Sequence, residues 1–292
     1  MDSLVRLCQS RGLDIDDRDA ASEAFSRLGY YRLSGYMLSF QEKGNGGTSH
    51  TFLEGVSFKD VLDAYTFDRK LRLVVMDAVE RIEISIRAII SDVMSLSHGP
   101  HWFLNPAGLG NPERKEEIVE KIREAVDQSR GGNGSLHIAH YYETYDDPPF
   151  PPSWMVFEVL SFGLVSKIYT VLPSEQRKAI ASRFGFTPEY ARSWFHMVSQ
   201  MRNICAHHGR LWNRVFGVVP KRAKNYDEHF REPEKFSKKL YCQIAVLKIL
   251  LDEIDPQSDW TETFKMFIAK NPHIDLGRMG FPEGWEGMDL WR

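Results

Sequence analysis

The sequence predicts an all-α protein built around a helical bundle. Apolar residues recur three and four positions apart over long segments, whereas the alternation of apolar and polar residues that marks half-buried strands is sparse. Hydrophobic residues make up 42% of the 292 positions, which is enough to fill a substantial core. We therefore expect a bundle that is preceded by an N-terminal helical extension and interrupted by a loop-rich insertion.

Residues 1–56 form the predicted N-terminal extension. A helical pattern reaches about Leu28 and is followed by LGYYRLSGYMLSF, whose glycines and serine predict a turn or a broken helix with sideways-packed tyrosines. The turn-rich sequence KGNGGTSH comes next. We therefore expect these residues to form a module of their own.

A long helix is expected over about residues 57–96, at the start of a central domain that spans 57–255. Gly99 and Pro100 predict where this helix ends. Its apolar residues follow one another at intervals of four and three, which makes a seam for a neighbouring helix. The seam residues are Val75, Val79, Ile82, Ile86, Ile89, Val93 and Leu96.

Residues 97–153 form the predicted loop-rich insertion. Apart from a charged helix near residues 112–128, this region is irregular, because the sequences GGNGS and DDPPFPPSW favour flexible or extended loops. Helical patterns return at about residues 154–172 and 173–183.

The next helix is expected after Thr187, an N-cap candidate followed by Pro188, a residue favoured at the first helical position. Its periodicity continues to about Arg214. Another amphipathic helix is expected over about residues 232–254. Residues 256–292 form a predicted tail, rich in loops, that packs on the bundle.

Charge and cysteine content limit where and how the protein acts. A net charge of −3 argues against nonspecific coating of nucleic acid, so any contact with RNA or DNA must use a local basic patch. Cys8, Cys205 and Cys242 are odd in number and far apart, which favours a reducing compartment. No signal-peptide core and no stretch of about 20 apolar residues is present. We expect a cytoplasmic protein without membrane association.

Polar residues interrupt a predicted helix at MRNICAHHGRLWNR, residues 201–214. His208 falls within the apolar seam of that helix, so we expect it to be a hydrogen-bonded core histidine. Arg202 lies on the same side as the small residues Ala206 and Gly209, which leave room for a long guanidinium. A neighbouring stripe at helical spacing is wholly polar. Its members are His196, Gln200, Asn203, His207, Arg210 and Arg214.

The first long helix contains a second polar interruption. Glu83 and Arg87 lie in the middle of a stripe that is apolar at both ends. If the two helices pack side by side, Glu83 meets Arg202 or His207, and its carboxylate fixes the orientation of either group. Alternatively, Glu83 and Arg87 form an i, i+4 pair that only stabilises their own helix.

These polar groups suit the cleavage of a phosphodiester. The planar fork of arginine matches phosphate oxygens, histidine moves protons near neutral pH, and asparagine orients a neighbour. Attack by the ribose 2′-hydroxyl would require an RNA substrate, and it would need no metal or cofactor because the substrate supplies the nucleophile. Zinc is not expected, because neighbouring residues on a helix diverge by about 100°. Alternatively, Arg202 and His207 are a structural pair that braces buried polar groups.

Arg202, Asn203 and His207 match the form R-N-x-x-x-H, which resembles the signature of the HEPN ribonuclease superfamily. Four longer segments, in order along nearly the whole chain, resemble the Abi-like family of bacterial abortive-infection proteins, of the AbiD/AbiF type. These segments are LGYYRLSGYMLSF, DRKLRLVVMDAVERIEISIRAII, PPSWMVFEVLSFGLVSKIY and MGFPEGWEGMDLW.

The resemblance implies a HEPN-type helical bundle and a metal-independent endoribonuclease that acts in antiviral defence. It also implies RNA products with 2′,3′-cyclic phosphate and 5′-hydroxyl ends. At the matching positions, Arg202 would bind the scissile phosphate, His207 would transfer protons and Asn203 would position both. Glu83 and Arg87 would support the site.

The resemblance also implies partners. Two signatures generally face each other in HEPN nucleases, so a homodimer with twofold symmetry is expected. A regulatory noncoding RNA, an antitoxin protein or a closed conformation would restrain the activity. The alternatives are a noncatalytic RNA-binding HEPN protein and a toxin–antitoxin subunit whose surface engages a protein. The densest basic run is expected to hold the RNA backbone unless it is merely a solvated face. This run comprises Arg210, Arg214, Lys221, Arg222 and Lys224.

Overall fold

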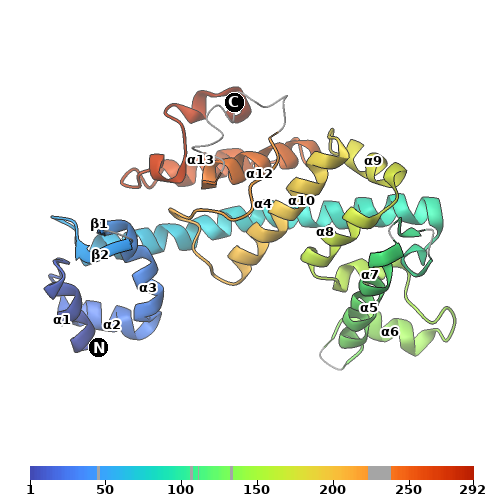
Figure 1. Ribbon diagram of the computed structural model, residues 1–292, viewed down its shortest axis with the longest axis horizontal. Coiled ribbons are helices and arrows are strands. Elements are labelled where there is room, and N and C mark those ends of the chain that lie inside the picture. Colours follow the sequence, from blue (N-terminus) through green and yellow to red (C-terminus); the bar gives the residue numbers. More distant parts are fainter. Residues whose placement is uncertain (45–46, 106–107, 111, 132–133, 223–237) are drawn as a thin grey trace.

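One helix, α4 (Phe58–His98), runs through the middle of the molecule, and the other elements are arranged along it (Figure 1). The computed structural model describes residues 1–44, 47–105, 108–110, 112–131, 134–222 and 238–292. The predicted all-α class is confirmed, because two short strands are the only sheet within these ranges.

The ends of α4 follow from local sequence. At the N-terminus, Ser57 and Asp60 form a capping box, in which each side chain accepts a hydrogen bond from the backbone N–H of the other. At the C-terminus, Gly99 follows the helix with a φ of 80°, a conformation that glycine adopts without steric cost. The helix predicted over residues 57–96 is therefore confirmed.

The buried seam of α4 differs from the predicted one near its C-terminus. Val75, Val79, Ile82 and Ile86 are fully buried as expected, but Leu96 is 79% exposed. Beyond Ile86 the buried positions step by four, to Ile90 and then Met94. Alternating intervals of three and four average 3.5 residues, whereas a straight helix has 3.6 residues per turn. A stripe of residues chosen at the shorter repeat therefore gradually rotates out of the buried interface.

The N-terminal module lies at one end of α4 and contains a hairpin that the sequence did not predict (Figure 1). The predicted turn or broken helix in LGYYRLSGYMLSF is mainly a regular helix, α3. Gly29, with a φ of 81°, makes the turn before it. Tyr36 is buried against α4 as expected, whereas Tyr31 is 93% exposed. The elements of this module are α1 (Asp2–Ser10), α2 (Arg18–Leu28), α3 (Tyr30–Met37), β1 (Gln41–Gly44) and β2 (Gly47–Phe52).

The opposite end of α4 carries the insertion and the helices that follow it (Figure 1). The charged helix predicted near residues 112–128 is present, and a second helix, α6, was not predicted. The helical pattern over 154–172 is broken at Leu160, and the Ser161 side chain then caps a new helix by accepting from Leu164 N–H. These helices are α5 (Pro112–Ser129), α6 (Leu136–Thr144), α7 (Ser153–Val159), α8 (Phe162–Val171) and α9 (Ser174–Ser182).

Helix α10 (Pro188–Ala206) packs against α4 and α8. It begins at Pro188 as predicted, but it ends at Ala206 rather than near Arg214. His208 adopts a left-handed φ of 56°, and Gly209 N–H donates to the Ile204 carbonyl at 2.7 Å. These features form a Schellman motif, which terminates a helix. The sequence hid this stop because the left-handed residue is histidine rather than glycine.

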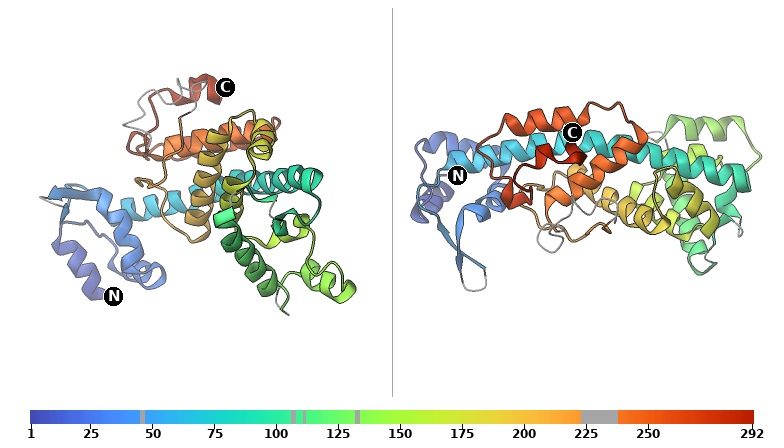
Figure 2. Two further views of the ribbon diagram at one scale, coloured as in Figure 1. Left: turned by 45° about the vertical axis from the view of Figure 1, so that its right-hand side comes forward. Right: turned by 90° about the horizontal axis from the view of Figure 1, so that it is seen from above.

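The C-terminal part of the chain covers α4 from another side, as both views in Figure 2 show. Helix α12 (Leu240–Ile254) corresponds to the predicted helix over 232–254, although the expected start lies outside the described residues. Helix α13 (Trp260–Ala269) was not predicted, and its Trp260 indole donates to the Val74 carbonyl of α4 at 2.8 Å. Within the described ranges, none of the helices has the length and apolar character needed to cross a membrane.

Candidate functional site

Glu83 of α4 and Arg202 of α10 face each other where the two helices pack. The Glu83 Oε2 atom lies 3.6 Å from Arg202 Nε. The carboxylate is largely buried, with 14% of its side chain exposed, whereas the Arg202 side chain is 34% exposed. The structure therefore contains the expected contact between Glu83 and Arg202, and it leaves part of the guanidinium open to solvent.

The second oxygen of the same carboxylate holds Arg87. Arg87 Nε donates to Glu83 Oε1 at 3.2 Å, and its Nη2 also contacts that oxygen. Arg87 Nη1 donates to the Phe157 carbonyl of α7, and its guanidinium lies 5.9 Å from the centre of the Phe162 ring. Glu83 thus bridges two arginines. Arg87 is buried and fully engaged, so it supports the site from behind instead of reaching a ligand.

Asn203 contacts Arg202 from the adjacent position on α10. Its Oδ1 accepts from Arg202 Nη1 at 3.5 Å, so the guanidinium is held by a carboxylate and by an amide. Within the described part of the chain, Arg202 Nη2 makes no hydrogen bond. Arg202 therefore combines a fixed orientation with donor capacity that remains available for an anionic ligand.

His207 lies at the C-cap of α10 with an exposed side chain. Its backbone N–H donates to the Asn203 carbonyl at 3.0 Å, which fixes the residue to the last turn of the helix. We expected His207 on a continuous helical stripe, but the helix ends immediately before it. The imidazole is consequently accessible from outside the molecule.

His208 contradicts its prediction as a core histidine. The chain turns away from the helical seam at this residue, which is exposed. Its described hydrogen bonds are those of the backbone, whose N–H donates to the Cys205 carbonyl at 3.1 Å and whose carbonyl accepts from Arg32 Nη1 at 3.0 Å. The helical seam ends at Ala206, so helical periodicity does not hold at His208.

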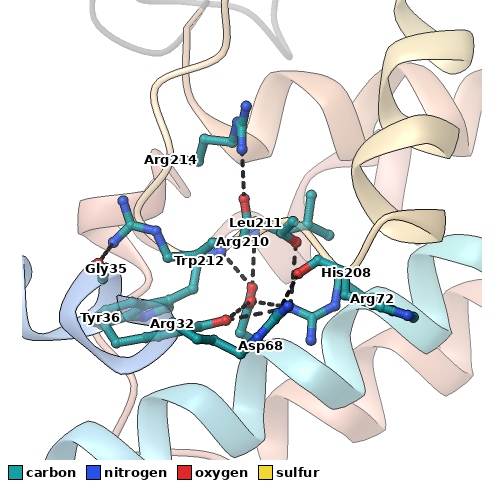
Figure 3. A network of polar contacts seen from close by, with 11 residues as sticks. Arg32, Gly35, Tyr36, Asp68, Arg72, His208, Arg210, Leu211, Trp212 and Arg214 are labelled. Atoms are coloured by element: carbon teal, nitrogen blue, oxygen red, sulfur yellow. Dashed lines mark hydrogen bonds and ion pairs between the residues drawn. The ribbon is translucent and has the colours of Figure 1, made fainter. Parts of the chain in front are cut away.

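Asp68 of α4 holds the segment that follows His208 (Figure 3). Its Oδ1 accepts the backbone N–H of Leu211 at 2.9 Å and that of Trp212 at 2.7 Å. Its Oδ2 accepts the Tyr36 hydroxyl at 2.6 Å and also contacts Arg72 Nη1. The carboxylate is fully buried, but it is satisfied by four donors.

Tyr36 and Arg72, the side-chain partners of Asp68, keep their protons in this buried environment. Desolvation and the neighbouring Asp68 carboxylate raise the pKa of Tyr36 far above its usual value, so this phenol remains a donor. Burial acts to lower the pKa of Arg72, but Asp68 and Tyr36 outweigh it and raise that pKa. We call Tyr36, Asp68 and Arg72 the Asp68 hub. It joins the N-terminal module, α4 and the loop after α10.

The Asp68 hub was not predicted from the sequence. Tyr36 and Trp212 are far apart in sequence, and no local pattern links them. One indication was available, since Asp68 and Arg72 form an i, i+4 pair and each directly follows a buried apolar residue, Phe67 or Leu71. Glu83 and Arg87, further along α4, are likewise an i, i+4 pair of charged residues within an otherwise apolar face.

The predicted basic run does not form one open surface. Arg210 Nη1 donates to the Gly35 carbonyl and its guanidinium lies over the Tyr36 ring, while burial lowers its pKa. Arg214 donates to the Arg210 carbonyl at 3.3 Å. These two arginines mainly brace the loop, whereas Lys221 and Arg222 are exposed. Lys224 lies outside the described residues.

The described ranges contain no cluster of three or more histidine, cysteine, aspartate or glutamate side chains suited to a metal ion. Cys8, Cys205 and Cys242 are free and buried. Burial raises the pKa of Cys205 and of Cys242 to about 12, so both thiols are protonated and unsuited to act as nucleophiles at neutral pH. Glu83 and Arg87 are largely buried, so among the site residues described above Arg202 and His207 are the ionisable side chains that solvent reaches.

A family model described as Abi-like protein matches residues 23–213. The match begins within α2 and ends in the loop after α10, so it includes the Asp68 hub and the Glu83–Arg202 pair. Helices α12 and α13 lie beyond it. No curated protein and no solved structure matches the chain significantly.

Proposed function

This chain belongs to the Abi-like protein family, and from that premise we propose that it is an abortive-infection endoribonuclease of HEPN type, related to AbiD/AbiF proteins. Family membership suggests a role in defence against phage. The RNA-cleaving activity rests on the groups gathered at the end of α10. The protein would act in the cytoplasm, where its RNA substrates are found.

One observation carries the proposal. Arg202 is oriented by Glu83 and Asn203 yet is partly exposed, and it lies on the same terminal turn region as the exposed His207. Exposed ion pairs contribute at most about 1 kcal/mol to stability. Stability alone therefore gives little reason for a partly exposed arginine to be oriented by a buried carboxylate. A positioned guanidinium beside an accessible imidazole suits phosphoryl transfer.

The proposed reaction is attack of a ribose 2′-oxygen on its neighbouring phosphorus. The P–O2′ bond forms and the P–O5′ bond breaks, while Arg202 neutralises the charge that develops on the non-bridging oxygens. A histidine takes the proton from the 2′-hydroxyl, and the leaving 5′-oxygen acquires a proton from a second acid. The substrate supplies the nucleophile, so the step is metal-independent and requires no cofactor.

The need for both a base and an acid motivates a homodimer. One His207 per chain provides one proton-transfer group, and twofold symmetry would bring a second His207 to the same phosphate. Because free ribonuclease activity would damage the host, we also propose that a noncoding RNA or an antitoxin protein restrains it.

The purified protein can test this function directly. Incubation with RNA should yield 2′,3′-cyclic phosphate and 5′-hydroxyl ends, and His207→Ala should abolish them without changing the circular dichroism spectrum. His208→Asn is the matched control, since it alters the adjacent exposed histidine and retains a residue that tolerates a positive φ. Equal cleavage by the His207→Ala variant would overturn the proposal. An RNA gel shift without cyclic ends would instead favour a noncatalytic RNA-binding protein.

A further inference from the structure

A groove runs along α10 and ends beside Asn203. It consists of adjoining hollows of about 570, 540 and 300 Å³ between α10, α8 and α5. Lys167 of α8 lines all three, Gln200 lines the first two and Lys121 lines the last two. Because they share lining residues, the three hollows adjoin one another along α10, and together we call them the α10 groove.

The lining of the α10 groove is more basic than the rest of the chain. Five cations and three carboxylates line it, in a protein whose net charge is −3. Concentrated positive charge in a depression attracts polyanions, because field lines are focused there. The cations are Arg114, Lys121, Lys167, Arg192 and Lys221, and the carboxylates are Glu117, Glu124 and Glu189.

Two of the three carboxylates are already engaged. Glu117 accepts a hydrogen bond from Lys121, and Glu189 accepts one from the Thr187 hydroxyl at 2.7 Å. Arg114, Lys121 and Lys167 line the same hollow as Glu117. Lys121 most strongly, and then Lys167 and Arg114, lower the pKa of that carboxyl group. Within the described part of the chain, the exposed side chains of Lys167 and Arg192 form no ion pair. Both are therefore open to an external anion.

The floor of the α10 groove carries hydrogen-bonding side chains. His196, Gln200 and Asn203 follow one another at intervals of four and three, so they share one face of α10. The rise of a helix places Arg192 about 16 Å from Asn203 along the axis. Asn203 in turn contacts Arg202 and accepts the backbone N–H of His207. A polyanionic chain lying in the α10 groove would thus reach Arg202 and His207, the proposed cleavage site.

We propose that the α10 groove binds the sugar–phosphate backbone of single-stranded RNA, with Lys167 and Arg192 as the central phosphate contacts. The identity of the polyanion rests on the proposed function, and the charge of the groove supports it independently. Single-stranded RNA fits better than a duplex because unpaired bases expose hydrogen-bonding edges to Gln200 and His196, and the 2′-hydroxyl adds a polar contact.

Fluorescence anisotropy with a labelled single-stranded RNA tests the α10 groove. All proteins carry His207→Ala so that binding is measured without cleavage. Adding Lys167→Ala and Arg192→Ala should weaken binding roughly tenfold and reduce the slope of log K against log salt by about 1.4, or 0.7 for each lost phosphate contact. The matched control adds Arg6→Ala and Lys59→Ala, which remove the same charge near the other end of the molecule and should leave binding unchanged.

The outcomes separate this inference from the nuclease proposal. Unchanged binding after loss of Lys167 and Arg192, or an equal loss in the control, would overturn the α10 groove. Equal weakening for duplex RNA and single-stranded DNA would overturn the assignment to single-stranded RNA. If only the nuclease proposal is wrong, the groove variant still loses binding and the His207-containing parent produces no cyclic ends. If only the groove is wrong, His207 still controls cleavage.

Discussion

The carboxylate of Asp68 accepts the backbone N–H of Trp212 at 2.7 Å, across 144 positions of sequence. This bond fastens the loop after α10 to the centre of α4. The loop begins at His207, so the position of His207 relative to Arg202 depends on the buried Asp68 hub. The hub therefore supports the candidate site from the buried core.

Replacing Asp68 by asparagine should destabilise the protein by about 3 kcal/mol. The substitution leaves the buried Arg72 guanidinium without its counter-charge, which costs far more than losing a surface ion pair. Urea unfolding followed by circular dichroism measures the change. Asp63→Asn removes an exposed i, i+4 partner of Lys59 and should cost less than about 1 kcal/mol. Similar decreases in the free energy of unfolding for both variants would show that the Asp68 hub stabilises the protein no more than a surface ion pair does.

Replacing Gly209 by alanine should weaken both stability and cleavage. A Cβ at this position would lie 3.1 Å from the Ile204 carbonyl oxygen and from its Cγ2, so the Schellman motif would open and move His207. Gly35→Ala is an informative contrast, because its Cβ would meet nothing within 4 Å inside α3. That change should stabilise the protein by about 0.5–1 kcal/mol. Thermal melts of the two variants should therefore shift in opposite directions, and parallel shifts would contradict this explanation of the helix end.

The sequence predicted features that depend on neighbouring residues, such as the ends of α4. It did not predict contacts between segments that are distant in sequence. The Ser57 capping box and Gly99 define α4 because their partners lie within four residues. The meeting of Glu83 and Arg202 was also foreseeable, because each interrupts an apolar helix face with a charge. The helix end at His208 could not be foreseen, because a residue other than glycine seldom occupies a left-handed position. Tyr36 and Asp68 could not be connected, since only the folded chain places α3 beside the loop after α10.

Replacing Glu83 by glutamine should lower stability, because it removes the counter-charge of the buried Arg87, and should reduce the cleavage rate of the folded protein by roughly a hundredfold. The neutral amide would no longer anchor Arg202, and small displacements of a catalytic group have effects of about that size. Glu80→Gln changes an exposed carboxylate on the same helix and should leave the rate unaltered. Single-turnover cleavage rates provide the comparison. A full rate for Glu83→Gln would mean that Glu83 only stabilises α4 through Arg87.

Protein stability should decrease at alkaline pH because of the buried thiols. Burial raises the pKa of Cys205 and Cys242 from 9.0 to about 12 in the folded chain. Between these values the unfolded chain releases protons that the folded chain retains, so the free energy of unfolding falls as the pH rises. The loss at pH 10 relative to pH 8 should be about 1 kcal/mol per thiol.

Urea unfolding of the parent and of the Cys205→Ala/Cys242→Ala variant at both pH values measures this contribution. The variant is expected to be less stable overall because alanine leaves cavities, but its decrease between pH 8 and pH 10 should be smaller. An equal decrease in the two proteins would assign the alkaline sensitivity to other groups.

The most direct test of the central claim is a transcriptome-wide map of RNA ends after induced expression of the parent and of the His207→Ala variant. If Arg202 and His207 form a ribonuclease site, 2′,3′-cyclic phosphate and 5′-hydroxyl ends should accumulate with the parent and return to background with the variant. Indistinguishable end profiles from the two proteins at equal abundance would contradict the claim.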